Sequence, residues 1–288
     1  MVNWPESLVI ELAARRCILF IGAGASASAA RPDDIVTHPP NWLQFLRILR
    51  EGWNRGNSDD SAVADELLAN RQYLDAAEIL RSTGLYPADY NRIIGRTFER
   101  YRPTEVHRLL EALDQKIVVT TNFDTLYEDH CRQGDAGSGY SVIQYYDEGL
   151  VARMRSPKHV ILKVHGCVSV PEKTVLSKSD YFKARANYAG YYKTLESLFL
   201  THTLLFIGYS VTDPDIQLLL ENTTITAPSD HPHYALMAHG LHPAIRNAFK
   251  RTFNIEILEF DPANNYEQFS MSLQDLANKV VEMREIQP

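Results

Sequence analysis

The chain has 288 residues, a length that fits one large domain, with or without a sizeable insertion, better than two balanced domains. Hydrophobic residues make up 45% of the sequence and charged residues 23%, which excludes a disordered or collagen-like chain. The net charge is −7 and no long run of Lys or Arg occurs, so we expect no direct binding to nucleic acid or to an anionic membrane.

Short apolar runs alternate with helical patterns along most of the chain. A helix is expected at residues 7–14, and strands are predicted at residues 17–21, 117–121, 160–164, 204–207, 234–237 and 255–260. Helical patterns at residues 124–131, 181–200, 213–220, 243–251 and 266–283 follow most of these strands. This alternation predicts an α/β fold with a doubly wound, mostly parallel, Rossmann-like sheet that is covered on both faces.

One interval departs from this alternation. Between the first two predicted strands the sequence contains amphipathic helical segments at residues 42–50, 61–68, 73–80 and 90–101, and no convincing strand. We interpret residues 1–288 as a single domain with a helical insertion at about residues 36–114, near the carboxyl edge of the sheet. The irregular stretch 134–156 predicts a mobile loop with a short strand at residues 140–145.

The three cysteines are Cys17, Cys131 and Cys167, and no pair of them has C-x-x-C spacing. This excludes a disulfide framework and a structural zinc site built from cysteines. Residues 1–16 lack the pattern of a cleaved leader, and no apolar run reaches the 18 or more residues that a membrane span needs. We therefore expect a soluble protein of the reducing cytoplasm.

A glycine-rich turn follows the first predicted strand, where residues 20–27 read FIGAGASA. Glycines in this G-x-G-x-x-A pattern permit a tight turn and close approach of a pyrophosphate to a helix N-terminus. The same pattern also occurs where a turn merely joins a strand to a helix. A dehydrogenase would next show a strand ending in Asp or Glu, but residues 37–42 read THPPNW, so hydride transfer is disfavoured.

Polar side chains follow two further strands. Residues 118–124 read VVTTNFD, which brings Thr121, Asn122 and Asp124 to the ligand-binding edge of an open sheet. The alternative is that Thr121 or Asn122 only caps the next helix. Residues 160–166 read VILKVHG, and His165 at the same edge has a side chain suited to general-base catalysis near neutral pH. The alternative is a structural role, which is the commoner one for a lone histidine, but His165 is followed by Gly and shares the sheet edge with Asn122.

A fourth strand opens into another turn, where residues 204–215 read LLFIGYSVTDPD. Gly208 and Ser210 can offer hydrogen-bond donors to phosphate or ribose, while Asp213 can be explained as the cap of the following helix. Four strand ends are thus expected to meet at one crevice, and their joint occurrence is far more specific than any one of them.

In this order the four segments resemble those of the sirtuin superfamily: a glycine-rich turn, a Gln-Asn-Ile-Asp-type segment, a His-Gly pair and a Gly-Thr-Ser-type turn. The resemblance covers roughly residues 13–260 and implies an NAD-consuming domain. It implies that Asn122 holds the nicotinamide ribose and a water, that Asp124 meets the carboxamide and that His165 is the base. The implied contacts to the pyrophosphate and the adenosine side come from Gly22, Ala23, Gly24, Ser26, Gly208 and Ser210.

This sequence departs from sirtuin deacylases in two places. Those enzymes carry two zinc-binding cysteine pairs between the His-Gly segment and the Gly-Ser turn, where this chain has only Cys167, so no zinc is expected. The Gly-Ile-Pro-Asp-Phe-Arg stretch of the family reads ARPDDI at residues 30–35, without the Phe and Arg that help to position the reactive sugar. Both departures disfavour the acyl-lysine reaction.

The resemblance is to zinc-free bacterial sirtuin-like proteins, which include NAD hydrolases of anti-phage defence. It implies hydrolysis of NAD to ADP-ribose and nicotinamide, with NAD depletion as the defence. A protein deacylase or ADP-ribosyltransferase, and a non-catalytic sensor of NAD or ADP-ribose, remain open as alternatives. A homo-oligomer and a defence partner of the ATPase or Argonaute type are further expectations.

Overall fold

One parallel sheet organises the chain. The computed structural model describes residues 2–34, 36–133 and 139–286. The seven strands within these ranges form a sheet of order β3-β4-β2-β1-β5-β6-β7, and every strand pair is parallel. The strands are β1 (Cys17–Ile21), β2 (Ile117–Thr120), β3 (Tyr140–Gln144), β4 (His159–Lys163), β5 (Thr203–Ile207), β6 (His233–Ala238) and β7 (Ile255–Phe260). The predicted α/β, Rossmann-like sheet is confirmed.

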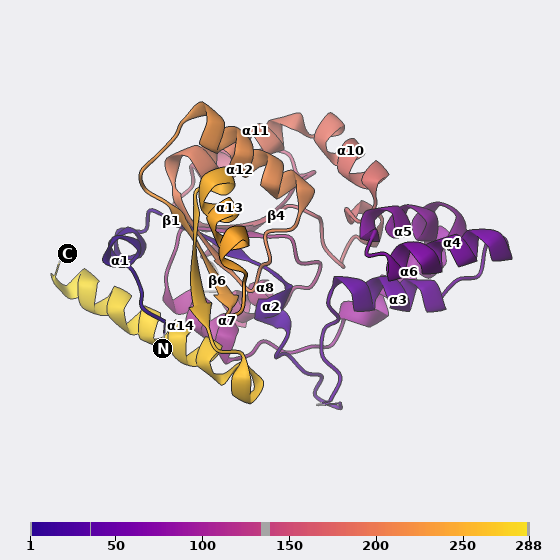
Figure 1. Cartoon of the computed structure of the whole chain (residues 1–288), viewed down its shortest axis with the longest axis horizontal. Coiled ribbons are helices and arrows are strands. Elements are labelled where there is room, and N and C mark those ends of the chain that lie inside the picture. The colour runs from indigo at the N-terminus through magenta and orange to yellow at the C-terminus, as the bar shows by residue number, and fades with distance from the viewer. Residues whose placement is uncertain (1, 35, 134–138, 287–288) are drawn as a thin grey trace.

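Helices cover both faces of this sheet (Figure 1). One face carries α1 (Glu6–Ala13), α7 (Glu105–Ala112), α8 (Leu126–Gln133) and α14 (Ala263–Ile286, with left-handed residues 264–266). The other carries α10 (Lys178–Asn187), α11 (Ala189–Thr201), α12 (Pro214–Thr226) and α13 (Pro243–Phe253). The layering explains why the central strands are nearly continuous apolar runs, since both of their faces are buried.

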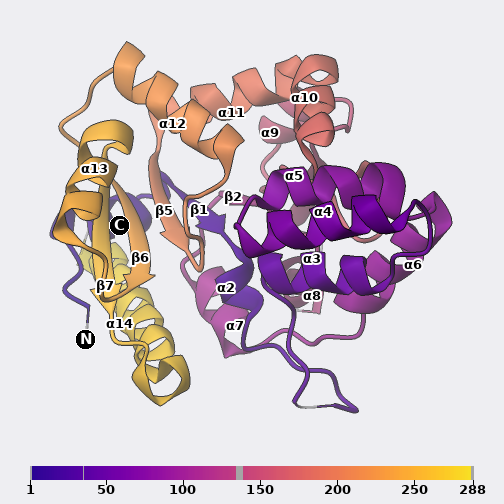
Figure 2. The same ribbon diagram turned by 45° about the vertical axis from the view of Figure 1, so that its right-hand side comes forward.

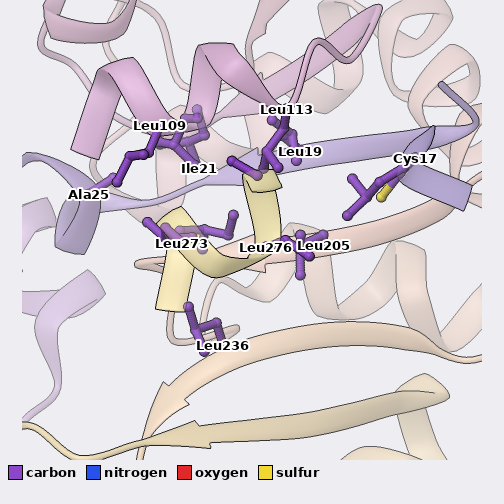
Figure 3. Close-up of a cluster of buried hydrophobic side chains, with 14 of the residues drawn as sticks. Cys17, Leu19, Ile21, Ala25, Leu109, Leu113, Leu205, Leu236, Leu273 and Leu276 are labelled. Carbon is purple, nitrogen blue, oxygen red and sulfur yellow. The ribbon is translucent and has the colours of Figure 1, made fainter. Parts of the chain in front are cut away.

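The central strand β1 shows how the two faces divide. Its five residues are all buried, and alternate side chains enter opposite hydrophobic clusters, with Ile18 and Phe20 in one and Leu19 and Ile21 in the other. Figure 3 shows the second cluster, where Leu109 of α7 and Leu273 and Leu276 of α14 lie on the side of β1 that carries Leu19 and Ile21. The sheet and its helices therefore form a rigid support beneath the strand ends.

A group of helices, called here the helical unit, lies to one side of the sheet (Figure 2). It consists of α3 (Trp42–Glu51), α4 (Ser58–Ala69), α5 (Tyr73–Ile79), the π-turn η1 (Leu80–Gly84) and α6 (Pro87–Phe98). It has its own hydrophobic cluster, which Phe123 and Leu176 of the sheet layer join. The guanidinium of Arg81 donates to the carbonyl of Thr174 at 2.7 Å and to Asp180 at 2.8 Å, which fixes the unit to the segment before α10 and to the first turn of α10.

Helix α7 lies inside the interval 36–114, and it packs on the sheet through Val106, Leu109 and Leu110 instead of joining the helical unit. The insertion at about 36–114 within a single domain stays a prediction. The predicted helix 181–200 is wrong as one element, because the chain breaks at Tyr188, between α10 and α11.

The remaining elements are short: α2 (Ala23–Ser26), α9 (Leu150–Met154) and the 3-10 turn η2 (Pro171–Lys173). Residues 134–138 of the predicted mobile loop lie outside the described residues, and the strand expected after them is β3. Within the described ranges, no helix has both the length and the apolar character that crossing a bilayer requires.

Candidate active site

A cavity of about 950 Å³ opens at the carboxyl ends of β1, β2, β4 and β5. The size is near the top of the range of about 300–1,000 Å³ that is usual for ligand pockets. It is lined by nine of the ten residues that the sequence nominates: Ala23, Gly24, Ser26, Thr121, Asn122, Asp124, His165, Gly208 and Ser210. The helical unit and the loops beside it supply the opposite wall, which includes Trp42, Phe45, Arg71, Gln72 and Tyr73.

The register of the sheet explains why these residues meet. Ile21 of β1 pairs with Thr120 of β2 and with Ile207 of β5, and Thr120 pairs with Lys163 of β4. The four strands therefore end at one level. Each candidate segment begins one or two residues beyond it, at the edge where open parallel sheets bind ligands.

The two glycine-rich turns pack directly against each other. The N–H of Gly22 donates to Ile207 O at 3.0 Å, and the N–H of Gly24 donates to Gly208 O at 2.8 Å. A β-carbon on Gly22 would lie 2.4 Å from Gly208 O, and Gly208 itself has φ of +63°. Gly22, the tenth nominated residue, does not line the cavity. These glycines allow the turns to approach each other. The N–H of Gly24 already donates a hydrogen bond to Gly208 O, so it is not left to donate to a ligand.

Asn122 is held by contacts to the end of its own strand, β2, and to α2 in the turn after β1. Its backbone N–H donates to Oγ1 of Thr120 at 3.1 Å, and its side-chain Nδ2 donates to Oγ of Ser26 at 3.3 Å. Helix α8 is instead capped by Asp124, whose Oδ1 accepts from the N–H of Leu126 at 3.1 Å. Asn122 does not cap the helix, so its carboxamide is turned toward the β1 turn and lines the cavity.

A buried ion pair supports the same loop from below. Nζ of Lys163, a fully buried side chain, lies 2.5 Å from Oε1 of Glu128 and 2.5 Å from the carbonyl oxygen of Asp124. Burial raises the pKa of Glu128, and Lys163 opposes part of that rise. Sequence reasoning missed this pair. The available signal was a lone lysine inside the apolar run 160–164.

His165 lies at the end of β4, buried among the cavity walls. Its carbonyl accepts from Val175 N–H at 3.0 Å, and the following Gly166 has φ of +81°. Burial lowers the pKa of His165, and the nearby carboxylate of Asp213 offsets part of this lowering. The imidazole is therefore neutral at pH 7 and able to accept a proton.

Two residues beside His165 were not nominated from the sequence. Asp213 does cap α12, because its Oδ1 accepts from Asp215 N–H at 3.0 Å and Ile216 N–H at 3.1 Å. Its second oxygen, however, lies 3.4 Å from Nε2 of His165. Tyr181 of α10 donates its hydroxyl to that same oxygen. The position of Asp213, on the same turn as Gly208 and Ser210, was the signal for this role.

The described residues contain no group of three or more His, Cys, Asp or Glu side chains placed to hold a metal ion. The cavity thus offers hydrogen-bonding groups from several strand ends and a neutral imidazole. This combination suits a polar organic ligand and a reaction that needs a proton acceptor.

Comparison with known proteins shows what this chain is similar to. A family sequence model described as SIR2-like domain matches residues 116–258, which contain Asn122 and His165. The chain is similar to an NAD(+) hydrolase ThsA from Enterococcus faecium, 31% identical over 150 residues, covering 51% of this chain and 31% of that protein. It is also similar to a defense-associated sirtuin 2 from Bacillus subtilis, 27% identical over 209 residues, covering 71% of this chain and 19% of that protein.

A third relative is the NAD(+) hydrolase ThsA from Acinetobacter baumannii (strain 532279), which is 24% identical over 232 residues. That match covers 80% of this chain and 44% of the relative. The chain therefore spans less than half the length of each of these three relatives.

Proposed function

The chain carries a SIR2-like domain and is sirtuin-like, and we propose that it is an NAD(+) hydrolase that cleaves the nicotinamide–ribose bond. The observation that supports this most directly is the single cavity into which four strand ends bring Asn122, Asp124 and His165. The reaction consumes NAD and water and yields ADP-ribose, nicotinamide and a proton.

The chemistry of bond cleavage fits the groups present. Departure of nicotinamide develops positive charge on the ribose, so the site needs groups that orient the sugar and a base for the attacking water. We assign the orienting role to Asn122, which is fixed between Thr120 and Ser26, and the base to the neutral imidazole of His165. Asp124 would meet the carboxamide of nicotinamide.

The remaining contacts follow from the two turns. We propose that Ala23, Ser26 and the backbone at Gly24 lie against the pyrophosphate, and that Thr121, Gly208 and Ser210 complete the nucleotide contacts. Because Gly24 N–H already donates to Gly208 O, Gly24 would contribute close approach and no hydrogen bond. Gly22 would act indirectly, by letting the turns meet.

The test is release of nicotinamide from NAD by the pure protein, with and without any co-encoded partner. Replacement of Asn122 or His165 by Ala should abolish release while the circular dichroism spectrum stays that of the wild type. His231→Ala is the matched control, because this exposed histidine lies outside the cavity. Full activity in both site variants would show that the assignment is wrong.

The same assay separates the alternatives. Consumption of an acyl peptide in equal amounts with NAD would indicate a deacylase, and labelled ADP-ribose on protein would indicate a transferase. Tight binding of NAD with no product under any condition would indicate a sensor. The similarity to two proteins named NAD(+) hydrolase favours hydrolysis, with water as the acceptor.

We extend the proposal to the cell. Depletion of NAD would serve anti-phage defence, as the name of the Bacillus subtilis relative suggests, and would take place in the cytoplasm. The three cysteines are free thiols, as that compartment allows. Expression of the wild type should reduce phage plaques, and His165→Ala should not.

A homo-oligomer, and a co-encoded partner of the ATPase or Argonaute type, belong to the same proposal. Mass photometry would measure the oligomer, and affinity capture of co-expressed neighbouring gene products would identify the partner. The net charge of −7 supports activity without direct binding of nucleic acid.

A further inference from the structure

The imidazole of His165 and the carboxylate of Asp213 form a buried pair behind the cavity. Nε2 of His165 lies 3.4 Å from Oδ2 of Asp213, and the two side chains are only 6% and 9% exposed. Nε2 is buried and has no hydrogen bond to the described part of the protein. A buried polar atom without a partner is costly, and the carboxylate of Asp213 is an acceptor within reach of a proton on Nε2.

The carboxylate is fixed in place by donors on both oxygens. Oδ1 accepts the N–H groups of Asp215 and Ile216 at the start of α12, and Oδ2 accepts the hydroxyl of Tyr181 at 2.5 Å. The ring of Tyr181 also packs edge-on against His165, with ring centroids 5.1 Å apart. These contacts hold the carboxylate of Asp213 beside the imidazole.

We propose that Asp213 is a positioning residue for His165, accepting the proton on Nε2 and thereby fixing the tautomer in which Nδ1 is unprotonated. Nδ1 has no hydrogen bond among the described residues, so it is the ring nitrogen left for a proton from the cavity. That proton comes from the attacking water or a ribose hydroxyl and converts the ring to an imidazolium. Asp213 then balances the new charge. The catalytic consequence rests on the proposed function, whereas the tautomer does not.

The surroundings of His165 support this assignment. The other charged side chains along the cavity are Arg71, Asp75, Asp124 and Lys178. None of them forms an ion pair or hydrogen bond with the imidazole within the described ranges, and Tyr181 is the titratable group that packs on the ring from α10. Burial lowers the pKa of His165, and Asp213 is the group that raises it again.

Nitrogen-15 NMR of the histidine-labelled, ligand-free protein tests the tautomer directly, with the His165 signals identified by their loss in His165→Ala. We expect protonated Nε2 and bare Nδ1. The reverse tautomer in the wild type would overturn the proposal without any need for a variant. Asp213→Asn keeps a cap for α12, because Asn and Asp cap helices about equally well. The substitution Asp213→Asn should lower the pKa of His165 and reduce the population of the tautomer that is protonated on Nε2.

Kinetics supply the second measurement. In Asp213→Asn we expect kcat/KM for nicotinamide release to fall roughly 10²-fold, the scale of general-base catalysis, with its acid limb moved to lower pH. Asp215→Asn is the matched control, since Asp215 pairs with Arg185 at 2.6 Å and makes no contact with His165; its acid limb should not move. Tyr181→Phe should retain the Nε2–H tautomer, with a loss of activity smaller than that of Asp213→Asn.

The outcomes separate the two proposals. An unchanged tautomer and titration of His165 in Asp213→Asn would overturn the role of Asp213, even if NAD is hydrolysed. Absence of nicotinamide release from the wild type under all conditions would overturn the proposed function. The NMR result would still decide whether Asp213 sets the tautomer.

Discussion

Replacement of Lys163 by Met should destabilise the protein strongly, because it leaves the buried carboxylate of Glu128 without its partner. Both side chains are almost fully buried, and their closest atoms are 2.5 Å apart. Removing one partner of such a pair costs about 3–5 kcal/mol. At roughly 2–3 °C per kcal/mol for a chain of this size, the midpoint of thermal unfolding should fall by about 6–15 °C.

The stability lost in Lys163→Met should be smaller at low pH than at high pH. Burial already raises the pKa of Glu128 in the folded protein, and loss of Lys163 removes the charge that opposes this rise. A carboxyl with a higher pKa folded than unfolded contributes stability below its unfolded pKa, near 4.3, and loses it as the pH rises through the folded pKa. Lys163→Met should therefore be closer to wild-type stability at pH 5 than at pH 8.

Urea unfolding at both pH values measures these effects. Glu128→Leu combined with Lys163→Met removes both charges and should be within about 2 kcal/mol of the wild type, or more stable. Lys158→Met, at an exposed lysine just before β4, is the matched control and should change stability by less than about 0.5 kcal/mol. A cost below about 1 kcal/mol for Lys163→Met at pH 8 would refute the reasoning.

Three further predictions concern the two turns, the base and the thiols. Gly208→Ala should cost about 2–5 kcal/mol in urea unfolding, because φ is +63° and the new β-carbon would lie 2.3 Å from the backbone nitrogen of Ala25. The acid limb of kcat/KM for nicotinamide release should have its midpoint below the ordinary histidine pKa of 6.5, since burial lowers the pKa of His165; a midpoint above 6.5 would contradict this. Ellman's reagent should label no cysteine before unfolding, because all three are buried: Cys17, Cys131 and Cys167.

The strands were predictable because their signal is local. Residues 17–21 and 255–260 are strands with the predicted bounds, and the others begin and end within two residues of expectation. The break at Tyr188 was not predictable, because residues 181–200 carry no proline and keep a helical pattern. In the folded chain the ring of Tyr188 packs against Tyr145 with centroids 5.2 Å apart, a contact that only the tertiary structure supplies.

The candidate site also contains residues that could be predicted from the sequence and residues that could not. Polar groups at strand ends could be nominated because parallel strands share one ligand-binding edge. The ion-pair partner of Lys163 could not be predicted, because Glu128 is 35 residues away and on a different element. Asp213 was passed over for a different reason. Its capping of α12 is a sufficient explanation in the sequence, and its other oxygen meets His165 only once β4 and β5 lie in one sheet.

The register of β2 and β4 links stability to the site. Thr120 pairs with Lys163, so Asn122 and His165 each lie two residues beyond a paired position. At the paired position, Lys163 donates a hydrogen bond to the carbonyl of Asp124. Two residues further along the chain, the imidazole of His165 lines the cavity. A one-residue shift of β4 would turn Lys163 to the other face of the sheet and separate it from Glu128. The buried pair therefore disfavours the register in which Asn122 and His165 would no longer face one ligand.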